Sequence, residues 1–194
     1  DFISLHIYVI MYLIRLPSEL TVGATIILCT RRNSVRIIAM SDSHGNAYAL
    51  KKIFERTKDT GDIFVHLGDG QRELDLMRAE YPSLEIHHVA GNCDYGSVSP
   101  NFEVIPCGDT KILITHGHIY GINYGRETLR CTAQNFGCKV ALFGHTHCRY
   151  EGYEDGVYLM NPGSCSCPRD FNKPSYGFVD ITPNGIITNI VDLD

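Results

Sequence analysis

The chain has 194 residues, of which 44% are hydrophobic and 20% are charged, and its formal net charge is −5. This length and composition predict one globular domain with a buried core, and they exclude a disordered, collagenous or coiled-coil chain. The acidic balance argues against a protein that coats nucleic acid, because such proteins are basic. Nine histidines and eight cysteines are present. No two cysteines form a CxxC pair, which disfavours a zinc ribbon or a thioredoxin-like site, and we expect reduced cysteines in a cytoplasmic protein.

The first 34 residues differ from the rest of the chain. Residues 2–14 are an apolar run that is shorter than the roughly 20 residues of a membrane-spanning helix. No positively charged segment precedes them, as it would in a signal peptide. They are either a membrane or export element or an extra segment ahead of a domain that begins near Val35. We expect an N-terminal extension of uncertain status over residues 1–34 and a domain over residues 35–194, with membrane attachment only if residues 2–14 act as an anchor.

A chain that begins at Val35 should therefore fold and keep the activity of the full chain. The reason is that every expected element and every polar motif described below lies after residue 34. Circular dichroism, thermal melting and an activity assay of the two chains side by side check this. Aggregation or lost activity in the shorter chain would show that the first 34 residues are part of the domain.

From Val35 onward, apolar strands alternate with helical patterns, which is typical of an α/β domain. The first strand stops at Asp42, and Asn46 is placed to cap the helix that follows. The second half is richer in strands and has hairpin turns near Gly108 and Asn184. By itself this alternation predicts a doubly wound sheet. The expected strands are 35–41, 63–67, 85–90, 102–106, 111–115, 139–143, 149–153, 157–160, 176–181 and 186–191, and the expected helices are 47–58, 74–81 and 123–136.

Five polar motifs directly follow expected strands, each about one strand-and-crossover unit after the last. The carboxyl ends of parallel strands lie at one edge of a sheet, so residues far apart in the sequence would meet there. The glycines let the chain turn sharply enough for the neighbouring side chain to enter a cleft. The motifs are Asp42-Ser43-His44, Gly68-Asp69, Gly91-Asn92-Cys93-Asp94, His116-Gly117-His118 and Gly144-His145-Thr146-His147.

The residue types in these motifs predict a transition-metal site. Carboxylate, amide and imidazole donors suit manganese, iron, zinc, cobalt or nickel better than calcium or magnesium, which prefer oxygen donors alone. The donors are too many for one ion, and a shared carboxylate could bridge two. A two-metal site activates water at neutral pH and clamps an in-line displacement at phosphorus. Single motifs are weak signals, since Gly-Asp alone occurs three times; the prediction depends on all five in order.

The order D-x-H, GD, GN, HGH, GHTH resembles that of the calcineurin-like metallophosphoesterase superfamily. Met40–Asn46, Gly91–Asp94 and Asn161–Ser164 are similar to the corresponding motifs of its small, single-domain YfcE-type phosphodiesterases. The resemblance extends from about Val35 to the end of the chain. It implies an α/β (α+β) fold of two packed mixed β-sheets flanked by helices, the metallophosphoesterase sandwich, in place of a doubly wound sheet.

The resemblance also implies a cofactor and its ligands. The cofactor would be two divalent transition-metal ions, manganese first, with zinc, iron, nickel or cobalt as alternatives. A hydroxide held between the ions would attack phosphorus. One ion would be bound by Asp42, His44, Asp69 and His147. The other would be bound by Asp69, Asn92, His116 and His145, so that Asp69 bridges the two.

The residue after the GN asparagine departs from a common family pattern. Many members have a histidine there that protonates the leaving group, whereas this chain has Cys93, as the small phosphodiesterases commonly do. The departure puts in doubt the efficient hydrolysis of esters with poor leaving groups. His118 is either a substitute acid or a residue that supports His116. The catalytic candidates are therefore His118, Asn92 and Asp69.

The expected function is hydrolysis of a small phosphodiester or a nucleotide-like substrate by a metal-dependent phosphodiesterase. Self-association into a homo-oligomer is left open. The alternative is a non-catalytic scaffold of the same fold that acts in protein–protein interaction. A scaffold can lose metal ligands, whereas every expected ligand position here holds a competent residue. The sequence therefore favours the enzyme.

Overall fold

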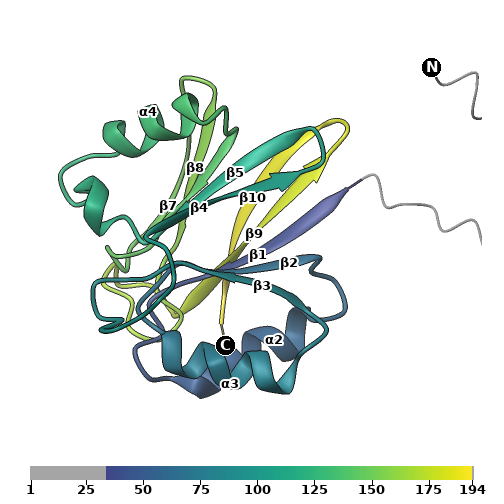
Figure 1. Ribbon diagram of the computed structural model, residues 1–194, viewed down its shortest axis with the longest axis vertical. Helices are drawn as coiled ribbons and strands as arrows, with labels where there is room; N and C mark the ends of the chain where they lie inside the picture. Colours follow the sequence, from purple (N-terminus) through teal and green to yellow (C-terminus); the bar gives the residue numbers. More distant parts are fainter. Residues whose placement is uncertain (1–33, 194) are drawn as a thin grey trace, which may run out of the picture. The chain divides into compact units, whose positions relative to one another are not determined.

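The computed structural model describes residues 34–193, which form two five-stranded mixed β-sheets flanked by helices (Figure 1). The expectation for residues 1–34 lies outside the described residues, apart from Ser34. In order across the first sheet, the strands are β10 (Gly185–Asp192), β9 (Ser175–Thr182), β1 (Val35–Met40), β2 (Ile63–His66) and β3 (Glu85–His88). In the second sheet they are β4 (Phe102–Cys107), β5 (Thr110–Thr115), β6 (Val140–Leu142), β8 (Val157–Pro162) and β7 (Arg149–Glu154). The sandwich is thus confirmed, and the doubly wound sheet is wrong.

Three helices within residues 34–193 cover the outer faces of this sandwich. Helices α2 (Ala47–Thr57) and α3 (Gln71–Glu80) lie against the first sheet, and α4 (Glu127–Asn135) lies against the second (Figure 1). A short 3-10 turn, His118–Tyr120, follows β5. None of the helices that the structure describes is long and apolar enough to cross a membrane.

The four consecutive apolar residues that end β1, Ile37 to Met40, explain its central position. Successive side chains of a strand point to opposite faces. Ile37 and Ala39 of β1 accordingly pack between the two sheets, while Ile38 and Met40 pack against α2 and α3. A strand with two apolar faces is stable only where both faces are covered. A third cluster, which includes Leu129, fills the space between the second sheet and α4.

Two expected helix boundaries are wrong. Helix α3 begins at Gln71 instead of residue 74, because the backbone N–H groups of its start donate to a distant carboxylate, that of Asp94. Helix α4 begins at Glu127 instead of residue 123. Asn123 is in a turn where its side-chain amide contacts the ring of His145 at 3.0 Å. At α3, a tertiary contact thus sets the first residue of the helix.

The pairing of the strands places the five polar motifs together. Strands β1, β2 and β3 are parallel neighbours in the first sheet, and β5 and β6 are parallel neighbours in the second. The motifs that begin at Asp42, Gly68 and Gly91 thus leave one sheet, and those that begin at His116 and Gly144 leave the other. The edge expected of a single sheet is instead a junction between two sheets.

Candidate metal centre

The structure brings the predicted ligand residues into one cluster. It contains three groups of potential ligand atoms, and within each group the atoms lie within 4.8 Å of one another. The groups share members and so form one continuous set of donors. They are Asp42, His44 and His147; His44, Asp69 and Cys93; and Asp42, Asp69 and His116.

One side of the cluster is formed by Asp42, His44 and His147. The Nε2 atoms of the two histidines face each other at 3.1 Å, and Nε2 of His147 lies 3.2 Å from Oδ1 of Asp42. This Oδ1 is fully buried but accepts no hydrogen bond from the described residues. Buried carboxylate oxygens are normally satisfied. An unsatisfied one beside two imidazole nitrogens fits a site that binds a cation.

The other side of the cluster is centred on His116. Its Nε2 lies 3.0 Å from Oδ1 of Asn92, 3.5 Å from Oδ2 of Asp69 and 3.3 Å from Nδ1 of His145. Oδ2 of Asp69 also lies 3.8 Å from Nε2 of His44, which belongs to the first side. The Asp69 carboxylate thus stands between the two halves of the cluster.

Backbone carbonyls orient two of the rings. Nδ1 of His116 contacts the Leu67 carbonyl at 2.7 Å, and Nδ1 of His147 contacts the Cys167 carbonyl at 2.8 Å. Each carbonyl can accept only an N–H, so Nδ1 is protonated in both rings and Nε2 keeps the free lone pair toward the cluster. Histidines that bind metals in proteins usually have such a partner on the far nitrogen.

The charges in the cluster shift the pKa values of His147 and Asp42. The Asp42 carboxylate, 3.2 Å from Nε2, raises the pKa of His147. Burial would raise the pKa of Asp42, but the adjacent ring of His147 and the nearby ring of His116 outweigh it and lower the pKa. Asp42 is therefore ionised and supplies the negative charge that a divalent cation needs.

Backbone strain is concentrated in this cluster. Within the described residues, seven non-glycine residues have a positive φ. Five of them are predicted ligands: Asp42, His44, Asp69, His145 and His147. This left-handed region costs about 1 kcal/mol or more for a residue with a Cβ, and such residues gather at functional sites. The strain aims these side chains into the junction, which a relaxed strand end would not do.

Two glycines in the motifs leave room for the acidic side chains. A Cβ at Gly91 would collide with the Asp69 carboxylate, and a Cβ at Gly144 would collide with Ser41 and approach Asp42. A side chain at Gly91 would therefore displace Asp69. A side chain at Gly144 would displace Asp42, because Ser41 donates a 2.6 Å hydrogen bond to its Oδ2.

Asp94 binds the backbone of the turns that carry the cluster and does not contribute a ligand atom. Its carboxylate accepts hydrogen bonds of 2.8 to 2.9 Å from the backbone N–H groups of Asp69, Gly70, Gln71 and Gly91. Burial opposes ionisation, but His88 and these N–H groups outweigh it and hold the pKa of Asp94 well below its usual range. One carboxylate thus joins the turn that carries Asp69 to the turn that carries Asn92.

A buried chain of hydrogen bonds holds the turn that carries Asp42 and His44. Nδ1 of His66 accepts from the Gly68 N–H at 3.2 Å, so its Nε2–H donates to Ser43 at 3.1 Å. Ser43 in turn donates to Glu73 at 2.7 Å, and the same oxygen accepts from the Gly45 N–H at 2.6 Å. Burial, with the neighbouring His88, lowers the pKa of His66 to about 3, so the ring is neutral. The chain is therefore a fixed support.

Cys93 and His118 lie at the margin of the cluster. Partial burial and the Asp69 carboxylate raise the pKa of the Cys93 thiol to about 11, so it is protonated at neutral pH. The ring of His118 lies 5.3 Å from that of His116, and its Nδ1 has no hydrogen-bond partner in residues 34–193. Burial, and then His116, lower the pKa of His118. Because the Leu67 carbonyl holds His116, His118 does not support it by a hydrogen bond.

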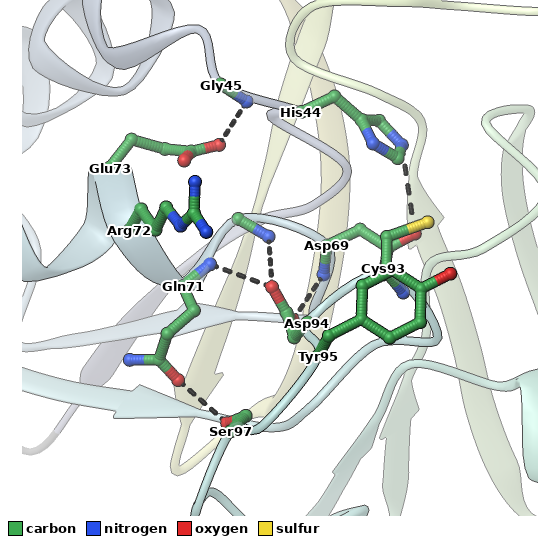
Figure 2. Close-up of a pocket in the computed structure, with 11 residues that line it drawn as sticks. His44, Gly45, Asp69, Gln71, Arg72, Glu73, Cys93, Asp94, Tyr95 and Ser97 are labelled. Atoms are coloured by element: carbon green, nitrogen blue, oxygen red, sulfur yellow. Dashed lines mark hydrogen bonds and ion pairs between the residues drawn. The ribbon is translucent and has the colours of Figure 1, made fainter.

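A pocket of 370 Å³ opens beside the cluster (Figure 2). Its lining includes His44, Asp69 and Cys93 from the cluster, and Arg72 and Tyr95 from outside it. Arg72, Tyr95 and Glu73 belong to none of the five polar motifs. An acidic residue in the first turn of α3 was a weak signal for Glu73, and nothing local marks the other two.

The fold and the cluster together define a class: an α/β sandwich with a candidate metal centre at the junction of its two sheets. A family model described as the calcineurin-like phosphoesterase superfamily domain matches residues 35–184. The chain therefore belongs to the calcineurin-like phosphoesterase superfamily, as its motifs predicted.

Individual relatives agree with this assignment. The chain is 30% identical over 159 residues to the probable metallophosphoesterase YsnB of Bacillus subtilis, covering 81% of this chain and 91% of YsnB. It is 28% identical over 169 residues to phosphodiesterase YfcE of Escherichia coli K12, covering 75% of this chain and 88% of YfcE.

Solved structures agree as well. The crystal structure of a predicted phosphoesterase from Streptococcus pneumoniae TIGR4 superposes with a TM-score of 0.73 at 31% identity, covering 82% of this chain and 90% of that one. Vacuolar protein sorting 29 from Cryptosporidium parvum superposes with a TM-score of 0.67 at 17% identity, covering 83% of this chain and 92% of that one. At that identity the second likeness concerns the fold alone.

Proposed function

We propose that this protein is a metal-dependent phosphodiesterase that hydrolyses small phosphodiesters at the junction of its two sheets. The observation that carries the proposal is the buried, unsatisfied Oδ1 of Asp42 beside the facing Nε2 atoms of His44 and His147. Such a donor arrangement is stable around a divalent cation and unfavourable without one. The phosphodiesterase name of the relative YfcE supports the substrate class.

Two divalent transition-metal ions fit the residues present. Asp42, His44, Asp69 and His147 would hold one ion, and Asp69, Asn92, His116 and His145 would hold the other. The donors are oxygen and nitrogen, which favours manganese, with zinc, iron, nickel or cobalt as alternatives. Two such ions supply an activated water molecule as the nucleophile and withdraw charge from the phosphate.

The chain's own residues prepare the site for this reaction. The Asp69 carboxylate stands between the two halves of the cluster and fixes their separation. Asn92 presents its amide beside His116 at 3.0 Å and would orient a phosphate oxygen. His118 is the candidate acid, because its ring lies near His116 and its Nδ1 is uncommitted. Cys93 keeps its proton at neutral pH and lines the pocket beside the cluster.

Metal loading should control both the stability and the activity of the full chain. We expect protein purified with manganese to hydrolyse bis-p-nitrophenyl phosphate, and we expect a chelator to abolish the activity and lower the melting temperature. Elemental analysis of the purified protein, together with release of p-nitrophenolate, measures both. Activity that survives complete metal removal would refute the proposal.

The scaffold alternative is not favoured. It depends on a likeness of fold. The predicted metal ligands, in contrast, are all present, and five of them adopt a positive φ at the cluster. A protein that binds two equivalents of metal but hydrolyses no mono- or diester of phosphate would favour the scaffold instead.

A further inference from the structure

The pocket beside the candidate metal centre contains one uncommitted cation, Arg72. This residue lies at the start of α3, and Figure 2 shows its side chain extending into the pocket. No ion pair or hydrogen bond joins its guanidinium to any residue among 34–193. The next arginine on the same helix, Arg78, pairs instead with Asp75 at 3.3 Å. An exposed guanidinium free of such a partner is available to a ligand.

Among the described residues, no acidic side chain that lines the pocket forms an ion pair with Arg72. Asp94 accepts from four backbone N–H groups, and Oε1 of Glu73 accepts from Ser43 and the Gly45 N–H. The Gln71 amide is also committed, since its oxygen accepts from Ser97 at 2.9 Å. Among the described residues that line the pocket, these contacts leave Arg72 to bind an anion brought by the substrate. Arginine binds phosphate and carboxylate groups through two parallel hydrogen bonds.

The same pocket carries an exposed aromatic ring. Tyr95 is 93% exposed, and Figure 2 shows its ring beside Cys93, which belongs to the candidate metal centre. A large ring with this exposure is not stabilised by burial in the protein core. It provides a flat face on which a planar group of a ligand can stack, and such stacking on a nucleobase is tolerant of base identity.

We propose that Arg72 and Tyr95 form a specificity subsite for a nucleotide-like substrate, in which Arg72 binds a second anionic group and Tyr95 stacks on a base. The proposal rests on the proposed function, because the subsite lies beside the phosphate that the candidate metal centre would cleave. The pocket shares His44, Asp69 and Cys93 with that centre. The subsite therefore selects diesters that carry both a ring and a further phosphate over simple alkyl diesters.

Binding of two adenosine phosphates to the manganese-supplemented full chain tests Arg72 without requiring turnover. Adenosine 3′,5′-bisphosphate should bind about tenfold more tightly than adenosine 3′-monophosphate, since a charge-assisted hydrogen bond supplies such a factor. In Arg72→Gln the preference should disappear, and in Arg72→Lys part of it should remain. The matched control is Arg78→Gln on the same helix, which should keep it. Isothermal titration calorimetry measures all four proteins.

Tyr95 is tested with the bisphosphate alone. Tyr95→Ala should weaken its binding about tenfold, and Tyr95→Phe, which keeps the ring, should restore it. A preference that is absent from the wild-type chain or survives in Arg72→Gln overturns the role of Arg72, and unchanged binding by Tyr95→Ala overturns that of Tyr95. Failure of the proposed function is separate: the full chain would then show the binding preference but hydrolyse no phosphodiester.

Discussion

Replacing Asp69 with asparagine should reduce phosphodiester hydrolysis by at least about a hundredfold. Residues that only orient metal ligands cost up to that factor when changed, and Asp69 faces both halves of the cluster directly. The change removes a negative charge that lies between the two halves. We therefore also expect fewer metal ions per chain, measured by elemental analysis beside the kinetics with bis-p-nitrophenyl phosphate.

The fold should survive this substitution. Oδ1 of Asp69 accepts the Cys93 N–H at 2.7 Å, and an asparagine oxygen can accept the same bond. Asp75→Asn is the matched control, because its carboxylate is exposed on α3 and pairs only with neighbouring side chains. Full activity in Asp69→Asn would remove the bridging role. Lost activity with an equal loss in Asp75→Asn would indicate a general effect on α3.

Replacing Asp94 with asparagine should destabilise the protein by about 3–6 kcal/mol. Oδ1 and Oδ2 each accept two backbone N–H groups, and in asparagine one oxygen becomes an NH₂ group that cannot accept. Two hydrogen bonds to a charged group are lost, each worth about 1.5–3 kcal/mol. Urea unfolding measures the loss. Asp109→Asn, in the exposed turn between β4 and β5, should change stability by less than about 0.5 kcal/mol.

The effect of Asp94 should depend on pH in one direction. Its pKa is held below the usual range in the folded protein, whereas in the unfolded chain it returns to about 3.9. The stabilisation is therefore fully present above the unfolded pKa and is lost as the pH falls toward the folded pKa. The stability difference between the wild type and Asp94→Asn should be constant from neutral pH to about pH 5 and shrink below about pH 4. A constant difference down to pH 3 would show that the carboxylate charge does not contribute.

The sequence predicts most of the helices and strands because their signals are local. The apolar run of β1 and the cap at Asn46, which accepts the Ala49 N–H at 3.0 Å, depend only on nearby residues. Helix α3 begins three residues before its expected start, because its first N–H groups bind Asp94, which lies more than twenty residues later. Boundaries set by distant partners leave no local pattern to read.

For the candidate site, the sequence by itself determined which residue types meet and in what order. The five motifs after five strands selected the donors, because parallel strands place their carboxyl ends together whatever lies between them. Only the tertiary structure decided that two sheets share the site, and that Asp94 and Glu73 support it. It also decided that Arg72 and Tyr95 enter its pocket uncommitted. Those roles depend on which groups each side chain meets across the fold, and that follows from packing rather than from spacing along the chain.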